Sequence, residues 1–388
     1  MGVSFAPILV LLLCSCAFAQ RMVDPASIPS AVARFEEQPG EQPLRCDVTP
    51  IRPTLNFSFR YQAGFVVRVP MNQYFGPGHG WEVLARITPE GSEPVYLLTN
   101  TRLPNIPKTK VELEVGGGYL LGEGAYGVHW VIFDDAGRVC RKNWRVEVRR
   151  NRGERKVKVA MPPGSVWEIS LRGNRSRKSD TDDVAPLGLT ILLHAAPMFP
   201  RRTKLRPNDM VTLMSTVSSL LDRVPTKNVR LVIFNLDQQK ELYRQDGFTL
   251  NAMGRVMQAM TSLELGLVDF GVLQNQRGHV DMLSGLVNQE LHALSPSDVV
   301  LFLGPMARYS DKVPQSAVAK GSGPAPHFFY FQVRPAFRQG GPPGGPIGPP
   351  APMLSDSISS AISRVGGKTI VIHNPADFAK AIEKLERR

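Results

Sequence analysis

The sequence has little of what enzymes and membrane-spanning proteins commonly use. Its 388 residues contain four cysteines and seven histidines. The Gly-x-Ser-x-Gly nucleophile motif and the His-Glu-x-x-His zinc motif are both absent. After the N-terminus, no apolar run reaches the ~18 residues that a transmembrane helix needs. These absences argue against the common hydrolase mechanisms and against a membrane span in the mature chain, and we expect a protein that is not an enzyme.

The N-terminus has the features of a secretory signal peptide over residues 1–19. An apolar core from Ala6 to Leu13 precedes the small-x-small cleavage site Ala17-Phe18-Ala19, although no Lys or Arg stands before the core. This pattern predicts a secreted or periplasmic protein that begins at Gln20. The alternative is a lipid anchor, in which Leu13-Cys14-Ser15-Cys16 is a loose lipobox and Cys16 is acylated.

Two cysteines, Cys46 and Cys140, remain after this cleavage. Export places them in an oxidising compartment, where an even pair is typically a disulfide. Because the two residues flank one predicted domain, we expect them to be bonded to each other. The alternative is a pair of buried free thiols.

Positive charge is in excess and is clustered along the chain. The formal net charge is +12, and basic residues concentrate in 149–158, 172–178 and 201–206. Basic clusters bind nucleic acids by counterion release, but export and the lack of interleaved aromatic residues argue against that partner. The alternatives left are a solvated linker and attachment to an anionic envelope surface.

The first half of the mature chain predicts an all-β domain. Residues 20–44 are polar and proline-rich, which indicates a loose N-terminal segment. Residues 45–150 contain short alternating runs separated by Gly, Pro, Asn and Asp, and predict about seven strands in a sandwich. The alternation Phe57-Ser58-Phe59-Arg60-Tyr61 predicts the first of these strands. Gly124-Ala125-Tyr126 resembles the tyrosine corner of immunoglobulin-like domains, so we expect an immunoglobulin-like sandwich.

The second half predicts a different class of domain. Residues 151–184 indicate a basic linker that holds one or two short strands. From 185 to 388, apolar strands alternate with amphipathic helices, which is typical of an α/β domain. The strand Leu189–Leu193 is apolar throughout, as expected when both faces of a sheet are covered. A Gly/Pro-rich insertion at 339–352 predicts a surface loop within this domain.

The order of strands and helices from Leu189 onward resembles a von Willebrand factor A (vWA) domain. The strongest match is the ending, Ile362 to Ile382, which has the family's final helix, Gly-Gly pair, strand and helix. Within that family the chain is similar to the divergent, exported vWA-related proteins of Acidobacteria. The resemblance implies a doubly wound, mostly parallel sheet that binds ligands at the C-terminal edge of its strands.

The resemblance also implies where a divalent cation would bind, and this chain departs from the family at each of those loops. The first loop is typically Asp-x-Ser-x-Ser, whose oxygens are hard ligands for Mg²⁺ or Ca²⁺. Here the Asp position is His194, and the two Ser positions are Ala196 and Met198. The second loop has His279 where Thr is expected, and the third has Gly304 where Asp is expected. We therefore predict a degenerate metal-ion-dependent adhesion site that binds no metal, and these residues become a candidate interaction edge.

Other functions stay open on the same residues. His194 and His279, with Asp237 or Asp281, are the ligand types that Zn²⁺ or Cu²⁺ prefers, and they are also the basis of an enzymatic alternative. The function that we favour is an exported, non-enzymatic protein that binds another protein or acts as a scaffold, without a cofactor. Attachment to the envelope surface through the basic stretches is the main alternative.

Overall fold

The computed structural model describes residues 20–24, 26, 43–169, 185–199, 202–263, 270–319, 325–334 and 355–386. The predicted signal peptide with Cys16, most of the segment 20–44, the end of the predicted linker and the insertion 339–352 lie outside the described residues. The chain divides into two compact units. Unit 1 comprises Met1–Thr54, Arg60–Arg150 and Met161–Ser170, and unit 2 comprises Leu55–Phe59, Asn151–Ala160 and Leu171–Arg388. The boundaries expected near residues 45, 150 and 185 stay predictions.

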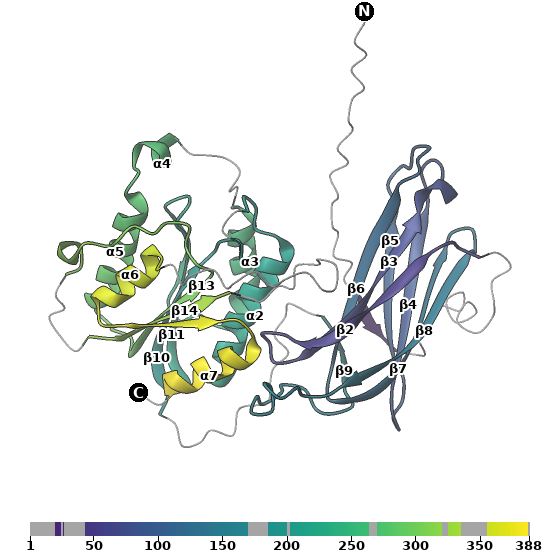
Figure 1. Cartoon of the computed structure of the whole chain (residues 1–388), viewed down its shortest axis with the longest axis horizontal. Helices are drawn as coiled ribbons and strands as arrows, with labels where there is room; N and C mark the ends of the chain where they lie inside the picture. Colours follow the sequence, from purple (N-terminus) through teal and green to yellow (C-terminus); the bar gives the residue numbers. More distant parts are fainter. Residues whose placement is uncertain are drawn as a thin grey trace, which may run out of the picture. The chain divides into compact units, whose positions relative to one another are not determined.

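Unit 1 consists of two antiparallel sheets (Figure 1). The first sheet has the order β1-β5-β4-β7-β8, with β1 Arg21–Val23, β4 Gly80–Pro89, β5 Val95–Arg102, β7 Gly124–Asp134 and β8 Val139–Val148. The second has the order β2-β3-β6-β9, with β2 Asp47–Leu55, β3 Tyr61–Pro70, β6 Glu112–Leu121 and β9 Val166–Glu168. Alternate residues of each strand point to opposite faces. The core of unit 1 includes Phe65 of β3 and Trp130 of β7, whose ring centroids are 5.1 Å apart.

Unit 2 is built on one mixed sheet with the order β12-β11-β10-β13-β14-β15. Its strands are β10 Leu187–His194, β11 Thr226–Asn235, β12 Lys240–Gln245, β13 Val299–Gly304, β14 His327–Val333 and β15 Lys368–Ile372. All eight residues of β10 are buried, because it lies inside the sheet with both faces covered. The edge strand β12 runs antiparallel to β11, whereas the other neighbouring strands pair in parallel.

Helices cover both faces of this sheet. The described helices of unit 2 are α2 Pro207–Arg223, α3 Met253–Thr261, α4 Phe270–Gln274, α5 Gly278–Leu291, α6 Ser357–Arg364 and α7 Pro375–Glu386. Apolar residues of α5 and α6 form one core cluster with residues of β10, β11, β13 and β14, among them Phe302 and Tyr330. On the opposite face, Phe378 of α7 meets Phe331 of β14 edge to face, with centroids 6.3 Å apart. Within the described part of the chain, no helix is long and apolar enough to cross a membrane.

The predicted fold class was wrong. The chain is mostly β, with two antiparallel sheets and one mixed sheet, and it shows no clear doubly wound vWA fold. Two connections explain the difference. The turn 236–239 joins β11 directly to β12 as an antiparallel hairpin, and the described residues between β13 and β14 contain the 3₁₀ turn Gln315–Ala317 but no α-helix. Prolines at 305 and 314 lie in that second connection, and proline disfavours a continuous helix.

The immunoglobulin-like identity of the first half is not confirmed by these two sheets. One local feature does agree with the sequence pattern: the hydroxyl of Tyr126 donates a 2.8 Å hydrogen bond to the carbonyl of Gly122. This is the type of bond that a tyrosine corner makes. A single corner holds one turn in place and does not define the topology of a domain.

The strand predicted at 57–61 is a turn followed by the start of β3 at Tyr61. Phe59 stacks on Phe378 of α7, with centroids 5.6 Å apart and an angle of 4° between the rings. The guanidinium of Arg223 lies 3.5 Å from the Phe59 ring centroid on the α2 side. The alternation of aromatic and polar residues therefore marks a contact within unit 2, and not a face of a strand.

Candidate binding site

The five residues predicted to form an interaction edge are all buried in unit 2. His194 and His279 are each 2% exposed, Ala196 is 5% and Met198 is 7%, and Gly304 is also buried. A partner cannot reach these side chains without displacing the chain's own residues. The edge is therefore closed by internal contacts.

His194, the last residue of β10, illustrates how this edge is closed. Its Nδ1 is 3.2 Å from the carbonyl oxygen of Pro305, and its ring stacks on Phe234 with centroids 5.3 Å apart. Burial lowers the pKa of His194, so the imidazole is neutral at physiological pH. A neutral buried ring packed on phenylalanine is a core residue of this unit.

His279 lies at the start of α5 and makes separate contacts. Its Nε2 is 2.9 Å from a carboxylate oxygen of Asp311, and its ring stacks on Tyr309 with centroids 4.0 Å apart. Among the described residues, no group of three or more His, Cys, Asp or Glu side chains is arranged to hold a metal ion. The described residues therefore show no arrangement that supports a Zn²⁺ or Cu²⁺ site with His194 and His279.

Asp356, which the sequence analysis did not single out, is the main polar anchor near this edge. It is 2% exposed and accepts hydrogen bonds from the backbone N–H of Ala307, the Tyr330 hydroxyl and the Gln332 amide. It also caps α6 by accepting from the backbone N–H of Ser359. An Asp directly before a predicted helix is a typical N-cap, so the sequence did carry a signal for this residue.

An accessible site lies at one end of unit 1, among its loops. A hollow with a volume of about 780 Å³ is formed by the residues around the start of β4, the end of β5 and the turn after β7. Its lining is Gly78, His79, Gly80, Trp81, Glu82, Asn100, Thr101, Arg102, Leu103, Phe133, Asp134 and Asp135. Burial raises the pKa of Glu82 in this lining. Loops on a rigid β scaffold are common binding sites, and we take this hollow as the candidate site.

Asp134 holds the base of this site together. Its carboxylate has no exposed surface and accepts from the Tyr74 hydroxyl at 3.0 Å and the Arg138 guanidinium at 2.6 Å. The backbone N–H groups of Ala136 and Arg138 donate to its other oxygen. Trp81 Nε1 donates to the Tyr74 hydroxyl at 2.9 Å, which extends the network to β4. Burial raises the pKa of Tyr74, so its hydroxyl stays protonated and can donate to Asp134.

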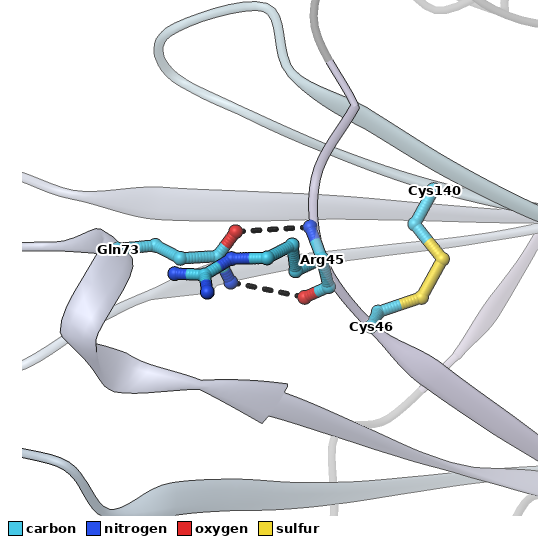
Figure 2. The surroundings of a disulfide bond; sticks show 4 residues. All are labelled: Arg45, Cys46, Gln73 and Cys140. Carbon is cyan, nitrogen blue, oxygen red and sulfur yellow. Dashed lines mark hydrogen bonds between the residues drawn. A yellow bond between two sulfur atoms is a disulfide. The ribbon is translucent and has the colours of Figure 1, made fainter.

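A disulfide lies in the neighbouring part of unit 1. Cys46 and Cys140 are bonded, with their Cα atoms 6.3 Å apart and 94 positions apart in the sequence. Figure 2 shows the Gln73 amide facing the backbone of Arg45, the residue before Cys46. The Gln73 amide accepts from the Arg45 N–H and donates to the Arg45 carbonyl, both at 2.9 Å. Because Arg138 also donates to the Gln73 carbonyl, the disulfide region and the Asp134 network share one backbone segment.

His79 and Asp135 form an ion pair on the wall of the hollow. His79 Nδ1 is 3.0 Å from Asp135, and Nε2 is 3.1 Å from the Phe75 carbonyl. Both ring nitrogens face acceptors, and so the Phe75 carbonyl and then Asp135 raise the pKa of His79. Burial acts to raise the pKa of Asp135, but bonds from His79 and the Gly80 N–H outweigh it and the pKa is lowered. The sequence offered only a cluster of glycines and aromatics at 74–81 as a signal for this site.

Comparisons with known proteins give no family for this chain. No family model and no curated protein matches it. The solved structures that it matches include a putative ApaA protein from Bordetella pertussis, at 18% identity and a TM-score of 0.21 over 28% of this chain and 98% of that chain. They also include a calcium-binding mutant of Bacteroides uniformis beta-glucuronidase 2, at 10% identity and a TM-score of 0.19, covering 74% of this chain but 33% of the other. Such low scores support no fold or activity, and they indicate no vWA domain.

Gly304 should be intolerant of any side chain. Its φ is 147°, and a Cβ there would lie 2.7 Å from the His194 carbonyl oxygen. We expect Gly304→Ala to lower the free energy of unfolding of unit 2 by about 2–3 kcal/mol, because the backbone of His194 must move. Gly366→Ala is the matched control, since Gly366 also has a positive φ of 70° but open space around it, and should cost about 1 kcal/mol. Equal effects of the two variants in urea unfolding would contradict the close approach.

The His79–Asp135 pair should make the stability of unit 1 depend on pH. The pKa of His79 is higher in the folded state than in the unfolded state, where it is about 6.5. The contribution of His79 to the free energy of unfolding is therefore complete below the unfolded-state pKa. This contribution is lost as the pH rises through the folded-state pKa. Asp135 stays ionised throughout this range, because its pKa is lowered. We expect His79→Gln to reduce the free energy of unfolding more at pH 6 than at pH 9, measured by urea unfolding. Asp135→Asn should reduce the same pH dependence without abolishing it, because the Phe75 carbonyl still favours the protonated ring. A His79→Gln effect that is the same at both pH values would contradict the pairing.

Proposed function

We propose that this chain is an exported, non-enzymatic protein that binds a protein partner or acts as a scaffold, and that the loop end of unit 1 makes the contact. The observation that carries the proposal is Phe75, whose surface is 75% exposed next to the hollow. Large aromatic side chains are frequent anchors in protein interfaces. Val111 is a second apolar residue with an exposed side chain, at 53% exposure. Its carbonyl accepts from the N–H of Met71, at the start of the segment that leads to Phe75.

The loop that carries Phe75 is held on both sides. Gly76 and Ile106 exchange two backbone hydrogen bonds of 2.9 and 3.0 Å, and the N–H of Leu103 donates to the His79 carbonyl at 2.8 Å. The φ values of Gly76 and Gly78 are 85° and 94°, which glycine adopts without strain. A loop that is already ordered loses little conformational entropy on binding, which favours affinity. This preorganisation supports a recognition role for the exposed ring.

The second candidate is attachment to an anionic envelope surface. Its support is the turn at 151–158, where Arg152, Lys156 and Lys158 are exposed. Not all of the basic residues there are available, because Arg150 is bound to Glu123. Binding to an anionic surface is electrostatic and weakens steeply with salt, whereas an interface anchored by a phenylalanine ring does not. Salt dependence therefore separates the two candidates.

The test places a photo-crosslinking amino acid at position 75 in the exported chain, with position 294 as the control site. Leu294 is a fully exposed apolar residue of unit 2. It therefore tests whether any exposed apolar position gives a crosslink. We expect a saturable crosslink to one protein from position 75 and none from position 294. With that protein purified, Phe75→Ser should weaken binding at least tenfold, as loss of an interface anchor does, and Leu294→Ser should leave it unchanged.

Two results would contradict the proposal. One is crosslinking that does not saturate or that is equal at the two positions. The other is binding that disappears between about 0.1 and 0.5 M salt in wild type and Phe75→Ser alike, which favours the electrostatic candidate. The melting temperatures of both variants should equal that of wild type, since neither side chain is buried.

A further inference from the structure

Gln20 is the first residue after the predicted cleavage site, and it is buried. It is 6% exposed, although it is polar and comes before a three-residue edge strand. Neither the oxygen nor the nitrogen of its side-chain amide has a hydrogen-bond partner among the described residues. Buried amides are nearly always hydrogen-bonded, so this residue needs an explanation.

The place of Gln20 in unit 1 is defined by both sheets. Arg21, the next residue, pairs with Leu98 of β5 in the first sheet. In the second sheet, a Cβ added to Gly117 of β6 would lie 3.1 Å from the Gln20 amide carbon and 2.4 Å from the Phe65 ring. Gly117 thus leaves a space that Phe65 and Gln20 share. The Gln20 side chain lies in an apolar part of the core.

Cleavage after Ala19 would add a charged group next to this unsatisfied amide. It would leave an α-ammonium group on Gln20, next to a buried side-chain amide without partners. An unsatisfied buried amide costs about 1–3 kcal/mol, and a charge close to the apolar core adds to this cost. A chemical change that removes the charge and the NH₂ group of the amide would therefore stabilise the folded mature chain.

We propose that the mature chain begins at Gln20 and that this residue is cyclised to pyroglutamate. The α-amino nitrogen attacks the side-chain amide carbon, a C–N bond forms, the bond from that carbon to Nε2 breaks, and ammonia leaves with the transferred proton. No oxidant, reductant or other co-reactant is needed. The product keeps one ring N–H and one ring carbonyl in place of the ammonium group and the whole carboxamide.

The modification has a consequence for β1. This strand covers Tyr96–Leu98 at the edge of the first sheet and is short, with Met22 45% exposed. An uncharged, cyclised end is compatible with burial of Gln20 against Phe65 and Gly117, which fixes the start of β1. The lactam also removes the free amine that aminopeptidases need, and so protects the strand that pairs with the open edge of β5.

The test is mass spectrometry of the full-length chain exported by a bacterial host and purified from the exported fraction. We expect the reduced protein to have a mass about 17 Da below that of a chain starting with unmodified Gln20, and its N-terminal peptide to lack a free amine. A synthetic peptide starting at Gln20, carried through the same handling, measures cyclisation during preparation. A free Gln20 amine, or any other first residue including an acylated Cys16, would overturn the proposal.

A variant provides the stability control. Gln20→Asn keeps an amide but cannot form the five-membered lactam, so it retains the α-ammonium group. We expect it to be unmodified and to melt at a lower temperature than the cyclised wild type. Enzymatic removal of pyroglutamate from unfolded wild-type protein, followed by refolding, should lower the melting temperature as well. Unchanged melting in both samples would contradict the argument from burial.

Discussion

The loop end of unit 1 depends on one buried carboxylate, that of Asp134. A buried charge is tolerated only if it is paired and hydrogen-bonded, and the network around Asp134 joins three separate segments. Tyr74 precedes the exposed Phe75, Arg138 follows the β7–β8 turn, and Trp81 of β4 is linked through the Tyr74 hydroxyl. The buried network around Asp134 therefore holds the surface loop that carries Phe75. It also holds the residues that line the hollow.

The side chains of the predicted edge of unit 2 are buried against the chain's own residues. At that edge Asp356 receives donors from Ala307, Tyr330 and Gln332, and His194 is neutral and packed on Phe234. The residues that depart from the metal-binding pattern thus belong to a buried, packed edge that a ligand does not reach. The hollow that a ligand can reach lies in unit 1.

The fold was predictable where short-range patterns decide it. The apolar run at β10 indicated a fully covered strand, and all eight of its residues are buried. The segment 57–61 was mistaken for a strand because Phe57 and Phe59 alternate with polar residues, while their packing partner, Phe378, is more than 300 positions away. Among the partners of Asp134, Ala136 and Arg138 are close in sequence, whereas Tyr74 is 60 positions away. Spacing alone therefore does not predict the burial of Asp134. The alternation of strands and helices predicted a doubly wound sheet, but it did not predict the connections between strands. The antiparallel hairpin after β11 is one connection that departs from that fold.

Amide hydrogen exchange in wild type and Asp134→Asn measures whether the Asp134 carboxylate orders the loop that carries Phe75. The variant keeps the size of the side chain but leaves the Arg138 guanidinium without its counter-charge, and breaking a buried pair costs about 3–5 kcal/mol. We expect the amides of Gly76, Leu103 and Ile106 to exchange at least tenfold faster in Asp134→Asn, while those of β10 in unit 2 are unchanged. Asp135→Asn, on the wall of the hollow, should leave the Gly76 and Ile106 amides protected. Unchanged protection of Gly76 and Ile106 in Asp134→Asn would contradict the claim that this carboxylate orders the binding loop.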